Sequence, residues 1–226
     1  MLRALVALIV SIFAGESVAG VIIGGTRLVY DAGKREASIR VATPEGESLP
    51  YLIQSWVEVG EGRSEKSGFI ITPPLFRLDP GQESAIRVVR MDDSLPRDRE
   101  SLFWLNIKSI PASEQTEQNQ LLIAVKSRLK LFYRPRDLPG TAVEAFRKLK
   151  YSTSAGSLLI DNPTPYYVTL ISLRVNEEHR FEKPGIMIGP HEIYRFQLPA
   201  GVVVKQVGWK VVNDFGGTSE EAIQKF

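Results

Sequence analysis

The sequence predicts an all-β protein made of two sandwich or barrel domains. Over most of the chain, apolar residues recur at every second position in short runs, which is the pattern of half-buried strands. Turns rich in Gly and Pro, such as residues 79–81, separate these runs at the short intervals typical of β-sandwiches. Residues 134–140 form a polar stretch with two prolines and a glycine, which indicates a linker between two domains.

The first nineteen residues predict a secretory signal peptide. Arg3 gives a positive start, residues 5–13 form an apolar run, and Ser17-Val18-Ala19 places small residues at the positions that signal peptidase reads. We therefore expect cleavage after Ala19. The apolar run is shorter than the ~20 residues that span a bilayer, so the mature chain is expected not to be inserted in a membrane.

Each predicted domain contains several strand candidates. In the first domain, residues 20–139, they are residues 39–41, 51–59, 69–71, 86–88, 102–110 and 121–133. The second domain, residues 140–226, begins with Val143, Phe146 and Leu149 at helical spacing, which predicts a short helix within 142–150. Its strand candidates are residues 158–160, 166–175, 193–198 and 202–212.

The composition argues against several classes of function. The chain has no cysteine, which excludes disulfides, thiol catalysis and cysteine-based metal sites. Its two histidines, His179 and His191, lie outside any metal-ligand pattern, so no metal and no cofactor is expected. A formal net charge of +2 gives no indication of a nucleic-acid partner.

Several motifs, in order along both domains, resemble those of one family. The most specific is the stretch 95–111, LPRDRESLFWLNIKSIP, and the second is the stretch 130–135, KLFYRP. Supporting matches are residues 26–27, 72–74, 77–81, 162–169 and 213–217. Together they resemble the periplasmic chaperones of the chaperone–usher pilus pathway. That resemblance implies two immunoglobulin-like β-sandwich domains set at an angle, with a cleft between them.

The resemblance also implies a function without covalent chemistry. A chaperone of this family binds pilus or fimbrial subunits in the periplasm by donor-strand complementation, a form of strand addition, and delivers them to an outer-membrane usher. The connection at residues 112–120 is short and polar, which together with the absence of cysteine resembles the short-loop members of the family. The expected protein is therefore a periplasmic chaperone and not an enzyme.

The strand implied as donor carries Leu121, Ile123 and Val125 on one face. Such alternation is also the ordinary sign of a strand that faces its own core. Leu122 and Ala124 make the opposite face apolar too, so one face can cover the chain's own core while the other serves a partner. An edge strand of this kind is prone to aggregation without a client, so self-association of the free chain is a further expectation.

The resemblance assigns two further sets of charged residues. Arg27 and Lys130 are the implied anchors for the C-terminal carboxylate of the subunit, a role that suits charge-assisted hydrogen bonds in a partly desolvated cleft. Lys130 is five residues beyond Val125, so a regular strand puts it on the opposite face, and a bulge, twist or long reach is required. Glu100, Arg134 and Asp214 are the implied interdomain charge cluster.

Two alternative functions remain open at this level. The chain could be a secreted immunoglobulin-like binding or structural module, such as a fimbrial subunit, although two full domains follow its first strand. It could also be a hydrolase that uses Glu58, Glu61 or Asp92-Asp93, but no Gly-x-Ser-x-Gly, phosphate loop or HExxH motif occurs.

Overall fold

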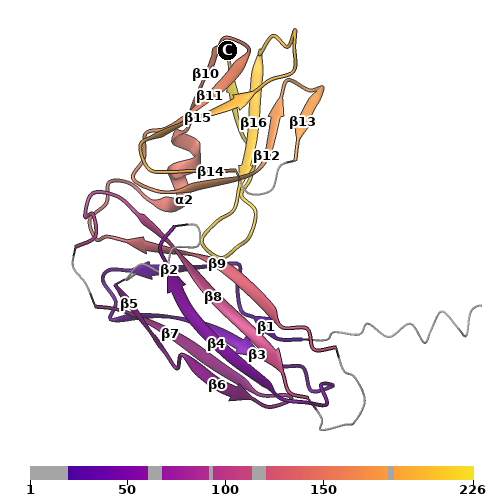
Figure 1. Ribbon diagram of the computed structural model, residues 1–226. Helices are drawn as coiled ribbons and strands as arrows, with labels where there is room; N and C mark the ends of the chain where they lie inside the picture. The colour runs from indigo at the N-terminus through magenta and orange to yellow at the C-terminus, as the bar shows by residue number, and fades with distance from the viewer. Residues whose placement is uncertain (1–19, 61–67, 92–93, 114–120, 183–185) are drawn as a thin grey trace, which may run out of the picture.

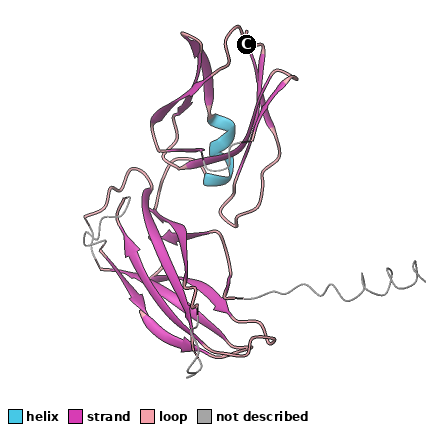
Figure 2. Ribbon diagram, turned by 45° about the vertical axis from the view of Figure 1, so that its right-hand side comes forward, coloured by secondary structure: helices cyan, strands magenta, loops and turns pink. Residues whose placement is uncertain are grey.

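The computed structural model describes residues 20–60, 68–91, 94–113, 121–182 and 186–226. The expected signal peptide, residues 1–19, lies outside the described residues, as do Glu61 and Asp92-Asp93. Within the described part, strands make up nearly all regular structure, so the all-β prediction is confirmed. Figure 1 and Figure 2 show two β domains stacked end to end, with the single short helix at the end of the second domain that faces the first.

The first domain is a sandwich of two sheets. One sheet has the order β1-β3-β7-β5, and the other has the order β2-β9-β8-β4-β6. In the second sheet, β2 pairs with β9 in parallel, while β9, β8, β4 and β6 are antiparallel. The strands are β1 (Ile22–Ile23), β2 (Arg27–Asp31), β3 (Glu36–Ala42), β4 (Tyr51–Glu58), β5 (Phe69–Thr72), β6 (Leu75–Leu78), β7 (Glu83–Arg90), β8 (Ser101–Pro111) and β9 (Val125–Arg134).

The alternation in the sequence decides which faces of these strands are buried. On β8, Phe103, Leu105 and Ile107 point into the core between the sheets, where they pack in one cluster with Leu129 and Leu131 of β9. The residues between them face outward. The outer face of this sheet therefore carries Trp104 and Asn106 of β8, as period-two alternation requires.

The second domain has its own sandwich and its own core. A helical turn, α2 (Ala142–Ala145) with η1 (Phe146–Lys148), lies where the sequence predicts a short helix. It is held to the sheet by the Trp209 indole, whose Nε1 donates to Phe146 O at 2.9 Å. The strands are β10 (Lys150–Ser154), β11 (Ser157–Asn162), β12 (Val168–Val175), β13 (His179–Phe181), β14 (Ile186–Ile188), β15 (Glu192–Gln197), β16 (Gln206–Val211) and β17 (Ala222–Lys225).

The strand predicted over residues 121–133 is shorter at its start than expected. β9 begins at Val125, and residues 121–124 belong to no strand. The ladder between β8 and β9 ends at the pair Ser109–Val125. Continued in the same register, it would set Ile123 opposite Pro111, which has no N–H to donate. Leu121 and Ile123 therefore precede the strand that the sequence analysis assigned to them.

Neither a membrane-spanning helix nor a metal cluster occurs in the described part of the chain. No helix there is long and apolar enough to cross a membrane. No three His, Asp or Glu side chains of the described residues gather closely enough to hold a metal ion.

Candidate functional site

One edge of β9 is only half covered. β8 pairs with β9 from Val125 to Tyr133, whereas β2 pairs with it only from Lys130 to Arg134. Between Val125 and Leu129, the edge of β9 on the β2 side therefore has no neighbouring strand among the described residues. Unpaired N–H and C=O groups on such an edge can accept an additional strand from another chain.

The core-facing side of β9 continues beyond the sandwich into solvent. Leu131 and Leu129 are 0% and 5% exposed, whereas Val125, Ile123 and Leu121 are 55%, 66% and 87% exposed. Val125, Leu129 and Leu131 share one face of β9 by parity, with Ser127 between them, whereas Ile123 and Leu121 precede the strand and extend this apolar row beyond its start. The exposures show that Leu121, Ile123 and Val125 are not buried in the core of the first domain.

A hollow lies where this row leaves the core. Its volume is about 280 Å³, and Ile123 and Val125 line it together with Ile23, Tyr51 and Ile107. Ile107 is 1% exposed, so the hollow reaches down to the domain core. The exposed part of the row is thus continuous with the interior of the first domain.

The two expected anchors lie side by side. Arg27 is the first residue of β2, and its register partner on β9 is Lys130. The β8–β9 register runs without a shift from Ser101 to Ser109, so no bulge carries Lys130 to another face. Lys130 therefore points outward, away from the core-facing row.

The outer face of β2 and β9 is the one that looks toward the second domain. Phe132, two residues after Lys130, lies with its ring centroid 5.5 Å from that of Tyr167. Arg27 Nη1 donates to Val212 O at 3.3 Å. Lys130 lies on this outer face beside Arg27 without a bulge, but it is not among the described residues that line the cavity between the domains.

Burial lowers the pKa of both expected anchors. Half-burial is the main cause for Lys130, and the neighbouring positive charge of Arg27 lowers its pKa further. Burial also lowers the pKa of Arg27, against the opposing charges of Asp214 and Glu100. Arg27 Nε is buried without a hydrogen-bond partner in the described part of the protein. Two desolvated cations, one of them with an unused donor, form a site that favours an anion.

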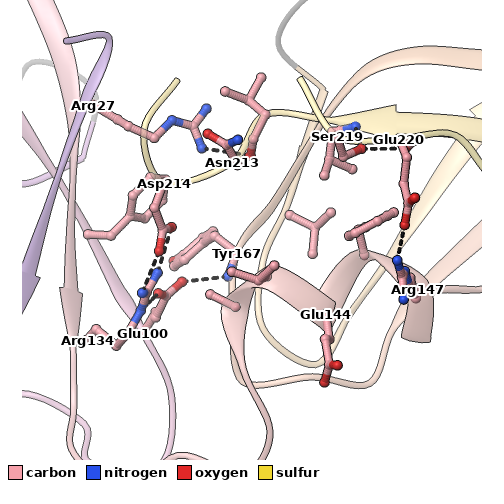
Figure 3. A pocket seen from close by; sticks show the side chains of 17 residues that line it. Arg27, Glu100, Arg134, Glu144, Arg147, Tyr167, Asn213, Asp214, Ser219 and Glu220 are labelled. Atoms are coloured by element: carbon pink, nitrogen blue, oxygen red, sulfur yellow. Dashed lines mark hydrogen bonds and ion pairs between the residues drawn. The ribbon is translucent and has the colours of Figure 1, made fainter. Parts of the chain in front are cut away.

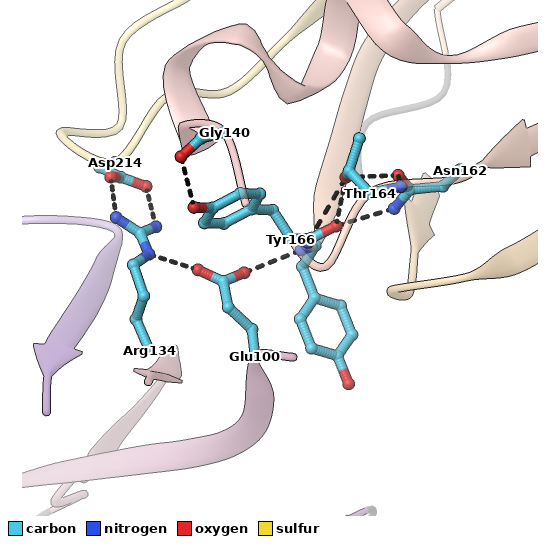
Figure 4. A network of polar contacts seen from close by, with 8 residues as sticks. Glu100, Arg134, Gly140, Asn162, Thr164, Tyr166 and Asp214 are labelled. Atoms are coloured by element: carbon cyan, nitrogen blue, oxygen red, sulfur yellow. Dashed lines mark hydrogen bonds and ion pairs between the residues drawn. The ribbon is translucent and has the colours of Figure 1, made fainter. Parts of the chain in front are cut away.

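A charge network joins the two domains (Figure 4). Arg134 Nε donates to Glu100 Oε1 at 2.6 Å, and its two terminal nitrogens donate to the Asp214 carboxylate at 2.7 and 2.9 Å. The other oxygen of Glu100 accepts from Tyr167 N at 2.8 Å. Glu100 is 3% exposed, and burial raises its pKa against the lowering effect of Arg134. A bidentate arginine between carboxylates from two domains restrains their relative position.

The loop that carries Asp214 is itself fixed at close range. The Asn213 side chain accepts from Phe215 N at 3.0 Å and from Gly217 N at 2.9 Å. Gly216 has a φ of +85°, and a Cβ there would lie 2.7 Å from Thr26 Oγ1. Only glycine meets both conditions, so the loop packs directly on the residue that precedes Arg27.

A cavity of about 290 Å³ lies between the domains beside this network. Figure 3 shows Arg27 and Arg134 at the first-domain side and the Arg147–Glu220 ion pair at the second-domain side. Phe132, Val143 and Val212 contribute apolar surface. Glu100, Glu144, Asp214 and Glu220 also line it, and three of these carboxylates are ion-paired with Arg134 or Arg147. Arg27 forms no ion pair with a described residue, so it is the lining cation that suits a chain end with a carboxylate.

Two family models match this chain over both domains. The model described as "Pili and flagellar-assembly chaperone, PapD N-terminal domain" matches residues 20–139, and "Pili assembly chaperone PapD, C-terminal domain" matches residues 144–223. The chain belongs to the pilus-assembly chaperone family. Members of this family act as non-enzymatic chaperones in pilus or fimbrium assembly, so the hydrolase alternative is set aside.

Relatives of this chaperone share its full length. It is 40% identical over 220 residues to the probable fimbrial chaperone LpfB of Escherichia coli O157:H7, which covers 95% of this chain and 93% of the relative. It is 36% identical over 220 residues to the chaperone protein FocC of Escherichia coli, with coverage of 96% and 95%.

Solved structures of chaperones have the same fold. The Escherichia coli chaperone DraB matches with a TM-score of 0.78 at 34% identity, over 92% of this chaperone and 98% of that chain. The SafB chaperone of Salmonella enterica, solved in complex with the SafA pilin, matches with a TM-score of 0.77 at 28% identity, over 94% and 99%. The predicted pair of immunoglobulin-like domains is confirmed.

The sequence does not show which site residues meet across the domains. Phe132 and Tyr167 meet there, and Gly216 packs on Thr26, although each pair is far apart in the chain. Alternation predicts which face of β9 holds Phe132, but not that this face meets another domain. The stretches 26–27, 130–135, 162–169 and 213–217 contain these residues and carry the family resemblance, but the sequence does not pair them.

Proposed function

We propose that this chaperone binds pilus or fimbrial subunits by lending them the segment from Leu121 to Leu129 as a strand. The observation that carries the proposal is the exposed apolar row that is continuous with the core of the first domain and lies beside an open backbone edge. Leu121, Ile123 and Val125 are the donated side chains. A subunit with an incomplete sandwich would gain both hydrogen bonds and apolar contacts from them.

The direction of the bound segment follows from the anchors. A client strand beside the open edge at Val125–Leu129 lies in line with β2, whose first residue, Arg27, pairs with Lys130. If Arg27 and Lys130 bind the client's terminal carboxylate, the rest of the client strand extends from Lys130 back toward Val125. The client strand then runs parallel to β9, as β2 does.

Burial of the donated row gives the binding its main driving force. Full burial of each apolar side chain is worth roughly 1.5–3 kcal/mol, so three of them supply about 5–9 kcal/mol before association costs. The carboxylate anchor adds charge-assisted hydrogen bonds and fixes the register, because it holds one end of the client strand at a defined place on β9.

The further partners follow from the same site. We infer that an outer-membrane usher receives the subunit during hand-over and that the chain works in the periplasm after removal of residues 1–19. Self-association is the expected state of the free chain at high concentration, since an exposed apolar edge at Val125–Leu129 invites pairing with a second copy.

A periplasmic pull-down tests the proposal. The wild-type chain and an Arg27→Ala, Lys130→Ala variant are each co-expressed with the subunit genes adjacent to its own gene. The wild type is expected to retain a small β-rich subunit and the variant to lose it. A Lys150→Ala, Arg195→Ala variant removes two exposed cations of the second domain and serves as the matched control.

The outcomes separate the two parts of the proposal. Equal retention by both chains leaves the chaperone proposal in place and shows that Arg27 and Lys130 are not the anchors. A wild-type chain that retains no subunit contradicts the proposal itself.

A further inference from the structure

Cations line the outer face of β9 beside its open edge. Lys126, Arg128 and Lys130 occupy alternate positions and so share one face, and Lys108 of β8 is the register partner of Lys126 on that face. We call these four residues the cation row. Among the described residues, the one carboxylate in contact with them is Glu58, 3.5 Å from Lys126 Nζ and 3.8 Å from Arg128 Nη2.

Two tryptophans hold the cations in place. Lys126 Nζ lies 4.9 Å from the ring centroid of Trp56, and Arg128 Cζ lies 4.1 Å from that of Trp104. Arg128 Nη2 also donates to a backbone carbonyl, that of Gly60, at 2.7 Å. Side chains fixed in this way lose little conformational entropy when they bind an anion.

The single carboxylate is also fixed. Trp56 Nε1 donates to Glu58 Oε1 at 2.8 Å, and this hydrogen bond holds the pKa of Glu58 below its usual value. Glu58 thus stays ionised at neutral pH. It cannot neutralise four cations, so the face keeps a net positive charge next to the open edge.

The arrangement is unfavourable in the free chain. Lys108 and Lys126 lie directly opposite each other on neighbouring strands, and like charges in such pairs are destabilising. Lys108 and Lys130 form no ion pair with any described residue. The positive charge beside the edge is therefore available to a partner that brings acidic side chains.

We propose that the cation row makes the chaperone bind preferentially to client strands whose side chains on that face are acidic. This inference rests on the proposed function, because a strand added along β9 places every second side chain on the outer face. Neighbouring strands lie about 4.7–4.9 Å apart, so these side chains would lie next to those of Lys126 and Arg128. The anchor at Arg27 and Lys130 fixes which client positions these are.

Synthetic nonapeptides with a free C-terminal carboxylate test the inference. Three peptides alternate Val with Glu, Gln or Lys, and a fourth carries the Val-Glu alternation shifted by one position. Each is labelled at its N-terminus, and its Kd for the purified mature chain is measured by fluorescence anisotropy. One of the two Glu registers is expected to bind about tenfold tighter than the Gln peptide, equivalent to about 1.4 kcal/mol, and the Lys peptide to bind more weakly than Gln.

Variants of the chain test whether Lys126 and Arg128 cause the preference for Glu over Gln. Lys126→Gln with Arg128→Gln should reduce the preference for Glu over Gln to about twofold, since the remaining exposed pairs are individually weak. Glu58→Gln should increase the preference, because it removes the competing carboxylate. Lys150→Gln with Arg195→Gln, far from β9, should leave it unchanged.

The result that overturns the inference differs from the one that overturns the proposed function. Equal binding of the Glu, Gln and Lys peptides, abolished by Arg27→Ala, shows that the anchor works and that the cation row does not select. A preference for Glu that stays near tenfold without Lys126 and Arg128 also contradicts the inference. If none of the peptides binds the wild-type chain, both the inference and the strand-addition proposal are wrong.

Discussion

Removal of Arg134 should destabilise the chaperone strongly at neutral pH. Arg134 is the only cation in contact with Glu100 among the described residues, and the Glu100 side chain is 2% exposed. Breaking a buried ion pair by deleting one partner costs about 3–5 kcal/mol, because the other charge stays buried without compensation. We expect Arg134→Met to fall in this range, since methionine keeps much of the volume but none of the donors.

The loss should depend on pH in a defined direction. Burial already raises the pKa of Glu100, and Arg134 opposes that rise, so the variant raises it further. The unfolded chain has a glutamate pKa of about 4.3, and the variant's folded state has a higher one. Below about 4.3 the carboxyl group is protonated in both states and costs no stability. As the pH rises through the folded pKa, the buried group ionises and the folded state loses stability. The deficit of Arg134→Met should therefore be smaller near pH 5 and grow toward pH 7.5.

Urea unfolding followed by tryptophan fluorescence measures this deficit at both pH values. Glu100→Gln is the matched partner, because its amide oxygen can still accept from Tyr167 N while its charge is gone. The double variant Glu100→Gln, Arg134→Met should recover most of the lost stability at pH 7.5. A deficit below about 1 kcal/mol, or one that neither varies with pH nor responds to Glu100→Gln, would refute the assignment of the cost to a buried carboxylate.

Three further perturbations follow from the structure. Asn162→Ala should lower the free energy of unfolding by about 2–3 kcal/mol, because the buried Asn162 Nδ2 donates to Tyr166 O at 2.7 Å and to Gly189 O at 2.8 Å. Thermal unfolding measures this loss. Because burial lowers the pKa of Lys130, this side chain should lose its proton below the ordinary lysine value near 10.4. Binding of a carboxylate-terminated peptide, measured by anisotropy titration, should therefore weaken as the pH rises toward that value. Lys130→Arg should remove the decline. Gly216→Ala should cost more than about 1 kcal/mol in urea unfolding. Thr26→Ala, which removes the hydroxyl that the new Cβ would meet, should not restore all of this stability, because the positive φ remains.

The sequence predicts the strands well wherever two physical signals agree. On β8, apolar alternation and the absence of Gly and Pro extend together, so the predicted strand 102–110 differs from Ser101–Pro111 by one residue at each end. Residues 121–124 are apolar at every position, which also predicts a strand, but no strand of the described residues pairs with them. Alternation reports which face a strand would bury, whereas a ladder also requires a neighbour.

The site residues, like the strands, can be predicted only in part from the sequence. Parity alone places Lys130 on the face opposite Val125, and the structure agrees, whereas the anchor role implied by the resemblance was expected to require a bulge, a twist or a long reach. Nothing local to the strand says that its outer face meets a second domain. Contacts such as Gly216 on Thr26, and Glu100 with Asp214 around Arg134, depend on the relative placement of two folded units, which single-strand patterns do not encode.

β9 carries the exposed Val125, three residues of the cation row and the contact with the second domain, and its register decides which face each of them occupies. The odd-numbered residues of β9 from Leu129 onward point into the core, and those before Leu129 are exposed or half-buried on the same face. The even-numbered residues contribute to the cation row and to the contact with the second domain. A register change of one residue would exchange these two faces. The uninterrupted pairing with β8 from Ser101 to Ser109 prevents such a change. The same register that buries Leu129 and Leu131 thus keeps Val125 and the proposed anchor Lys130 on opposite sides of one strand, so that a client strand added as proposed would meet apolar contacts on one face and charge on the other.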